Sequence, residues 1–390
     1  MSRNANRILQ PRWNFGGLLL VGLIVSLAVN GVAADRSALI DAIRKIDHEA
    51  AGATEAKSAW KQLAAGTGAD LLPILKSLAD ANPLAANYLR SAAESIVDRE
   101  LAAKKPLPTS DLEAFIKDLS QSPRARRFAF ELLTTVDPST PDRLIPGMLN
   151  DPSVELRRDA VARLMAKGQQ ELDAKQNDAA KTTLQQAMNA ARDKDQVDLL
   201  VKQLGDLGVK VDLPKHFGFV LDWKLIGPFD NSGKKGFPVA YTPEREVDFK
   251  AEYDGKNGQK VKWTEHKTDD AYGLVDLNKA LTNHKGSITY AEAEFNSGKE
   301  QTVDLRLGTP NAWKIWLNGE LLFGREEYHR GAAVDQYIVR GKLKPGKNVI
   351  LLKVCQNEQT EEWAQRWQFQ LRICDATGTA IPPANQTAQK

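Results

Sequence analysis

The chain has 390 residues, a length that predicts two domains, each long enough to bury a core of its own. Its formal net charge is +3, and the first 34 residues contain three arginines (Arg3, Arg7 and Arg12) and no acidic residue. The remainder of the chain is therefore neutral, and it has no basic stripe with interleaved aromatic residues. These features exclude nucleic acid as a predicted partner.

Residues 1–34 have the pattern of a secretory signal peptide. The three arginines precede an uncharged apolar stretch, and small residues at 32–34 predict cleavage before Asp35. The pattern predicts an exported protein, periplasmic or secreted. The alternative is an uncleaved anchor, since the segment 15–34 is long enough to cross a bilayer, and contact with a membrane is expected only in that case.

Residues 35–212 carry helical patterns almost without interruption. At 151–164, Pro152 suits a first helical turn and Asp151 is the expected cap. A buried stripe is predicted at Val154, Leu156, Ala160, Val161 and Leu164. Weaker echoes begin at Asn82 and Ser122, and residues 174–207 predict two more helices, broken near 193–195. Each helix pair needs its neighbours to bury its apolar face.

The segment 151–164 resembles the second helix of a HEAT repeat, and 174–207 is similar to a tetratricopeptide hairpin. This resemblance implies a stacked helical array over 35–212, with a protein partner on its concave surface. A non-repetitive helical bundle is the alternative.

Pro214 ends the helical pattern, and residues 215–376 predict an antiparallel β-sandwich. Asn318-Gly319 between two β-prone runs predicts a two-residue hairpin with a type I′ turn. Residues 377–390 are predicted to be a flexible tail. Strands are predicted at 217–226, 246–253, 259–266, 287–295, 301–307, 312–317, 320–324, 334–340, 347–355 and 366–374.

The β half resembles a galactose-binding-like jelly roll, such as the sugar-binding domain of family 2 glycoside hydrolases. The resemblance rests on the strand pattern, on Trp316 to Gly319, on Leu305 to Gly308, and on Lys344 to Val354. It implies a carbohydrate ligand. The two halves together resemble exported bacterial proteins.

The sequence contains no convincing catalytic or metal-binding motif. His48-Glu49 begins like a zinc-protease helix but lacks the second histidine. No cofactor is therefore expected, with a structural calcium at loop acids such as Asp230 left open. Cys355 and Cys374 are expected to be free thiols. A glycoside hydrolase is an alternative, because it needs two carboxylates and the loops contain five candidates. These are Glu326, Glu327, Glu358, Glu361 and Glu362.

Two polar loops, 325–331 and 356–367, are the predicted ligand-binding surface. A sugar needs a flat aromatic face and planar hydrogen-bonding groups, and Trp363 in a loop fits the first need. The predicted ligand-binding residues are Trp363, Arg325, Glu327, Tyr328, His329, Asn357 and Glu358. The alternative is a solvated loop with Trp363 tucked into the core. Core positions are predicted for Trp223, Trp263, Trp313, Trp316 and Trp367.

The sequence thus predicts an exported, non-enzymatic binding protein with domains at 35–212 and 215–376. Its sandwich would bind a carbohydrate or cell-envelope polymer, and its helical array a protein. Two alternatives are a scaffolding protein without a small ligand, and a glycoside hydrolase that uses the loop carboxylates.

Overall fold

The computed structural model describes residues 36–384, which fall into two compact units that divide between Leu107 and Pro108. The predicted signal peptide lies outside the described residues. Within residues 36–384, no helix is long and apolar enough to cross a membrane.

In its described part, residues 36–107, the first unit contains helices and turns and no strand. Its longest helix, α4, begins where Asn82 accepts a hydrogen bond from Ala85 N at 2.9 Å and Pro83 occupies the first turn. The face of α4 that carries Ala85, Leu89, Ala92 and Ile96 is fully buried, so the neighbouring helices pack closely along it. The helices are α1 (Arg36–Arg44), α2 (Ala53–Ala64), α3 (Leu71–Ser77) and α4 (Pro83–Ala102).

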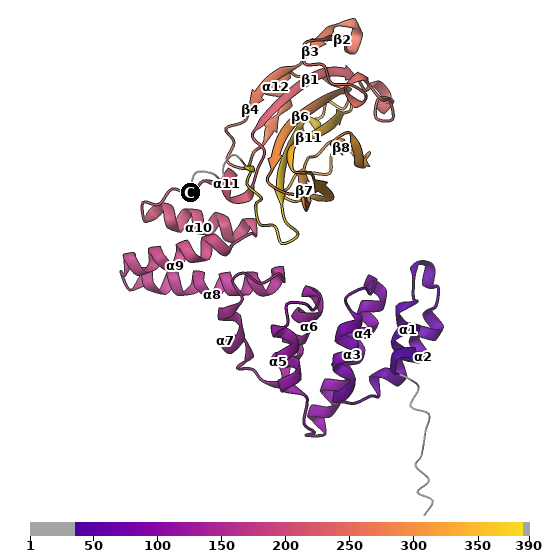
Figure 1. The fold of residues 1–390 in the computed structure, drawn as a ribbon, viewed down its shortest axis with the longest axis vertical. Coiled ribbons are helices and arrows are strands. Elements are labelled where there is room, and N and C mark those ends of the chain that lie inside the picture. The colour runs from indigo at the N-terminus through magenta and orange to yellow at the C-terminus, as the bar shows by residue number, and fades with distance from the viewer. Residues whose placement is uncertain (1–35, 385–390) are drawn as a thin grey trace, which may run out of the picture. The chain divides into compact units, whose positions relative to one another are not determined.

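The second unit begins with seven helices and continues into the sheets. Helices α8, α9 and α10 lie side by side (Figure 1), and α11 leads into the first strand. The hairpin predicted at 174–207 is present as α9 and α10. The bounds are α5 (Thr109–Lys117), α6 (Pro123–Val136), α7 (Thr140–Leu144), α8 (Val154–Asp173), α9 (Asn177–Ala190), α10 (Lys194–Asp206) and α11 (Leu213–Phe217).

The start of α8 differs from the sequence prediction. Ser153, and not Asp151, caps the helix, while Asp151 accepts a bidentate pair of 2.7 Å hydrogen bonds from the buried Arg126 of α6. Asp151 is therefore occupied in tying α6 to the entry of α8. Val154, predicted to be buried, is 43% exposed, because the helix turns its first residue away from the apolar stripe.

Two main antiparallel sheets form the β part, as the sequence predicts, and residues 252–254 and 260–262 pair in a separate two-stranded sheet. The larger has the order β4-β1-β6-β11-β8-β9, and the smaller β10-β7-β12-β5. Figure 1 shows β1, β6, β11 and β8 side by side in the larger sheet. The strands are β1 (Asp222–Asp230), β2 (Glu252–Asp254), β3 (Lys260–Lys262), β4 (Thr264–Lys267), β5 (Val275–Asp276), β6 (Ser287–Ser297), β7 (Gln301–Gly308), β8 (Ala312–Leu317), β9 (Glu320–Arg325), β10 (Tyr337–Leu343), β11 (Gly346–Gln356) and β12 (Gln368–Cys374).

One apolar core lies between the two sheets, and Trp223, Trp313 and Trp367 are its largest members. A second cluster on the other face of the larger sheet contains Trp263 and Trp316. All five tryptophans predicted to be core residues are buried. Cys355 and Cys374 are buried free thiols.

The chain between β1 and β3 covers the second cluster, and a buried lysine is hydrogen-bonded to this chain segment. Lys353 of β11 has no exposed side-chain surface, and its Nζ donates to Phe237 O at 3.1 Å, Val239 O at 2.6 Å and Glu244 Oε1 at 2.8 Å. All three donors are satisfied, as a buried ammonium requires. Lys353 is therefore a structural residue.

The predicted hairpin is confirmed, because β8 and β9 pair through Leu317 and Glu320, with φ of 54° at Asn318 and 84° at Gly319. The strand predicted at 246–253 is wrong in most of its length, since regular pairing begins only at Glu252. The sequence prediction also missed α12 (Leu277–Leu281). That helix is a single turn capped by Asp276, which is too short for a periodic signal.

The domain boundary predicted near residues 212–215 stays a prediction, although the compact units divide elsewhere, at Leu107 and Pro108. The first residues of the predicted tail are hydrogen-bonded: Asp375 N donates to Thr379 O, and Ile381 N to Ile373 O. Residues 385–390 of that tail lie outside the described residues.

Candidate functional site

Three loops meet at one end of the larger sheet because of its pairing. Asp230 at the end of β1 and Gln356 at the end of β11 both pair with Ser287, the first residue of β6. Arg325 at the end of β9 pairs with Trp313, near the start of β8. Antiparallel pairing therefore brings residues 231–236, 325–331 and 356–365 together. These three loops are called the Trp363 site below.

Asn231 is the buried centre that joins the loops. Its side-chain amide donates to Gln356 O at 3.0 Å and to the hydroxyl of Tyr328 at 3.1 Å, and its Oδ1 accepts from Gly236 N at 3.1 Å. A fully buried amide with these partners fixes the three loops relative to one another. The sequence prediction missed Asn231, and the available signal was an Asn-Ser-Gly turn directly after a strand.

Trp363 lies in a short 3₁₀ turn (Glu362–Ala364), and 62% of its surface is exposed. Its ring meets the His329 ring at a centroid distance of 5.0 Å and an angle of 85°, an edge-to-face contact. His329 is in turn hydrogen-bonded through Nε2 to Asn357 Oδ1 at 2.9 Å. A buried amide thus orients an imidazole, and the imidazole supports an exposed indole.

Asn357 is only 1% exposed, so its place is beneath the surface and not in it. Its side chain also binds Gln359, and its carbonyl oxygen accepts from Gly286 N at 2.9 Å. Glu358 is exposed and accepts a hydrogen bond from Gly233 N, which ties it to the loop after β1. Tyr328 is half-buried, with Lys234 Nζ 5.1 Å from its ring centre.

Arg325 and Glu327 form a separate ionic group with Arg330. Arg325 Nε lies 2.8 Å and Arg330 Nε 3.1 Å from Glu327 Oε2, and Arg325 also donates to Oε1 at 2.9 Å. Hydrogen bonds from Arg325 and then Arg330 lower the pKa of Glu327 to about 2. Glu327 is therefore a carboxylate with both oxygens engaged, and the arginines keep spare N–H groups toward solvent.

The structure thus links five of the predicted residues, Tyr328, His329, Asn357, Glu358 and Trp363, through the loop contacts given above. Within residues 36–384, the side chains of Arg325 and Glu327 bond to each other and to Arg330, and share no hydrogen bond with these five residues. No group of three or more His, Cys, Asp or Glu side chains in the same range is arranged to hold a metal ion. Asp230, the expected calcium ligand, accepts from Ser232 Oγ at 2.6 Å and lies 3.7 Å from Lys256 Nζ.

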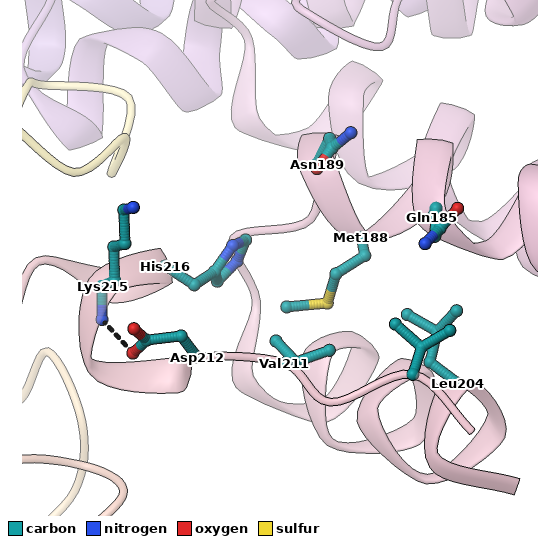
Figure 2. A pocket seen from close by; sticks show the side chains of 9 residues that line it. Gln185, Met188, Asn189, Leu204, Val211, Asp212, Lys215 and His216 are labelled. Carbon is teal, nitrogen blue, oxygen red and sulfur yellow. Dashed lines mark hydrogen bonds between the residues drawn. The ribbon is translucent and has the colours of Figure 1, made fainter. Parts of the chain in front are cut away.

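A separate hollow of about 370 Å³ lies on the helical side of the second unit. Its floor is apolar, with Met188, Leu204 and Val211, and Gln185 and Asn189 stand at its rim (Figure 2). Asp212 caps α11 there by accepting from Lys215 N at 3.0 Å. No Trp, Tyr or Phe side chain lines the hollow, so it offers less to a sugar than the Trp363 site does.

No protein family model matches the chain, and no curated protein matches it. Among solved structures, it is similar to a β-glucosidase from Kluyveromyces marxianus, with 11% identity over 45% of this chain and 21% of that chain, at a TM-score of 0.25. The same enzyme in complex with glucose gives 10% identity, 73% and 36% coverage, and a TM-score of 0.26. The GH31 α-xylosidase from Xanthomonas citri is 12% identical over 42% of this chain and 17% of that chain, at a TM-score of 0.20. The chain therefore spans little more than a third of these proteins at most, and the likeness assigns neither a family nor an activity.

Proposed function

We propose that this protein is an exported, non-enzymatic binding protein that recognises a carbohydrate or cell-envelope polymer at the Trp363 site. The observation that carries the proposal is the indole of Trp363, which is largely exposed and held from below by His329 and Asn357. A single exposed apolar side chain is common on protein surfaces, but this ring is held in a fixed orientation by its edge-to-face contact with His329. A flat ring beside planar polar groups suits the apolar face and the hydroxyls of a sugar.

The proposal gives the other parts of the chain supporting roles. The helical part is a HEAT-like array that binds a protein partner, and the sandwich is a jelly roll of the galactose-binding kind. Residues 1–34 act as the export signal. No cofactor takes part.

A glycoside hydrolase is the second candidate, because carboxylates lie in the loops of the Trp363 site, with Glu327 and Glu358 among them. Glycoside hydrolysis needs one carboxyl group with a raised pKa to protonate the leaving group. The two arginines lower the pKa of Glu327, which is the opposite of what a general acid needs. Glu327 is therefore unsuited to act as the general acid of such a reaction. A scaffold without a small ligand remains the third candidate.

The test is calorimetric titration of the full-length protein with cell-wall and plant-type oligosaccharides, after a glycan array has found the best ligand. Trp363→Ala should abolish measurable binding. Arg325→Ala and Glu327→Ala should each weaken it by about 1–3 kcal/mol, the range for hydrogen bonds to charged groups. Phe249→Ala removes another partly exposed ring, away from the site, and should bind as the wild type does.

Three results would decide against the proposal. Unchanged affinity in Trp363→Ala would exclude this site. An array without any bound glycan, for a folded protein, would favour the scaffold. Release of reducing ends from a bound polysaccharide would favour the hydrolase.

A further inference from the structure

The five residues after β12 form a compact turn. Asp375 Oδ1 accepts hydrogen bonds from Thr377 N at 2.8 Å, Thr379 N at 3.0 Å and Thr377 Oγ1 at 2.7 Å. Asp375 N donates to Thr379 O at 2.9 Å, and Gly378 supplies a φ of 81°. Residues 375–379 therefore have a defined conformation that exposes several carbonyl oxygens to their surroundings.

Four arginines hold this turn, two from the helices and two from the smaller sheet. On the helical side, Arg157 of α8 donates to Thr377 O at 2.6 Å, and Arg192, after α9, donates to Thr379 Oγ1 at 3.3 Å. On the sheet side, Arg306 of β7 donates to Ala376 O at 3.3 Å and Arg372 of β12 to Gly378 O at 3.0 Å. Both the helices and the smaller sheet are therefore hydrogen-bonded to this turn.

The sheet-side arginines are hydrogen-bonded to carboxylates, whereas the helix-side arginines are hydrogen-bonded to neutral oxygens and interact with the Asp375 carboxylate only through its charge. Asp335 accepts from both Arg372 and Arg306, whereas Arg157 and Arg192 make no ion pair within residues 36–384. Arg157 is 6% exposed, and burial lowers its pKa; burial, and then the charge of Arg157, lowers the pKa of Arg192 to about 10. For the buried Arg157, Thr377 O of the turn is the nearest acceptor. The half-buried Arg192 adds the Thr379 hydroxyl to the carbonyl oxygens of Ala191 at 2.6 Å and Asn189 at 2.8 Å.

We propose that residues 375–379 act as a clasp that fastens helices α8–α10 to the sandwich, and that opening the clasp frees these helices to move against the smaller sheet. Asp375 stabilises the conformation of the clasp through its hydrogen bonds. Oxygen atoms of the clasp accept hydrogen bonds from the arginines, and Arg157 and Arg192 are the donors on the helical side. The clasp reinforces the junction at β12, where Val220 N donates to Leu371 O and Ile373 N to Gly218 O, both at 2.9 Å. Those two bonds hold only the chain after α11. Between α8–α10 and the β part, the clasp adds hydrogen bonds to an apolar cluster that contains Phe217 and Phe219, and to the hydrogen bond from Tyr272 to Asp198 of α10.

Hydrogen exchange of the full-length protein, read by mass spectrometry, tests the clasp. The double variant Arg157→Ala/Arg192→Ala removes the two hydrogen-bond donors on the helical side. Gly378→Val opens the turn from the other side, because its φ is positive and a Cβ there would lie 3.2 Å from Arg306 Nη1 and 3.4 Å from Arg372 Nη2. The matched control is Arg158→Ala, an exposed neighbour that pairs with Asp195.

In both clasp variants, exchange should rise at least tenfold in α8–α10 and in 375–381. The interior strands β6 and β11 should keep the protection of the wild type, and the control should match the wild type throughout. Faster exchange in 375–381 alone would overturn the proposal, because the helices would then be held without the turn. An equal loss of protection in β6 and β11 would also overturn it, since the turn would then be an ordinary part of one cooperative core.

Discussion

At the scale of single residues, His216 shows how burial settles a charge state. It lies on α11 beside the hollow seen in Figure 2, and its Nε2 is 3.0 Å from Ala191 O. Burial, and next the charge of Arg192, lowers the pKa of His216 to about 4. The folded protein therefore keeps this imidazole neutral at pH values where an unfolded chain, with a histidine pKa of about 6.5, would protonate it.

This difference predicts a loss of stability in mild acid. The folded pKa lies below the unfolded one, so the unfolded state binds the extra proton and the stabilising contribution is fully present only above about pH 6.5. Between about pH 6.5 and pH 4, His216 should cost the fold roughly 1–3 kcal/mol as the pH falls. Urea unfolding across this range should show a flatter pH dependence in His216→Asn than in the wild type. His48→Asn, whose side chain is 98% exposed, should leave the dependence unchanged. An equal slope in His216→Asn would contradict the prediction.

At the scale of elements, the β8–β9 hairpin depends on one backbone position. Gly319 has a φ of 84°, and a Cβ there would meet no atom within 4 Å. Gly319→Val should therefore cost only backbone strain, roughly 1–3 kcal/mol, measured as a lower midpoint of chemical unfolding. Gly205→Val in α10 is the control, because that site is equally open and its φ is not positive. Equal effects of the two variants would show that the side chain, and not the positive φ, matters.

Local signals explain which elements the sequence could predict. The hairpin was found because two adjacent residues specify its turn, and the strand paths from 287 to 325 followed from alternating patterns of normal length. α12 was missed because one turn has no periodicity, and 246–253 was misread because its apolar residues line an irregular segment over the larger sheet. The candidate site was partly predictable: exposed loop composition pointed to Trp363, but the burial of Asn357 and the linking role of Asn231 depend on pairings between distant strands.

At the scale of the whole molecule, an apolar cluster crosses the boundary that the sequence predicted. Phe217 and Phe219 pack with Tyr272 and with side chains of α8, α9 and α10, including Val161, Leu184 and Leu200. Phe217 is completely buried and Phe219 is 8% exposed. Each buried aromatic ring is worth roughly 1.5–3 kcal/mol, which is a sizeable share of a typical domain stability of about 5–15 kcal/mol. Helices α8–α10 are thus part of what stabilises the sandwich.

Fragments of the chain test this directly. A fragment of residues 108–390 should fold and unfold in one cooperative transition, because it keeps both the apolar cluster and the 375–379 turn. A fragment of residues 215–390 should melt at a lower temperature and bind a hydrophobic dye, because Phe217 and Phe219 lose the helices that cover them. The fragment also begins inside α11. Without an ordered α11, Arg372 loses its acceptor Phe217 O, to which it donates at 3.1 Å in the intact chain. Calorimetry and dye fluorescence on the two fragments, at equal concentration, measure the difference. If both fragments melted at the same temperature without binding dye, the helices would add nothing to the sandwich, and the domain boundary would lie near residues 212–215 after all.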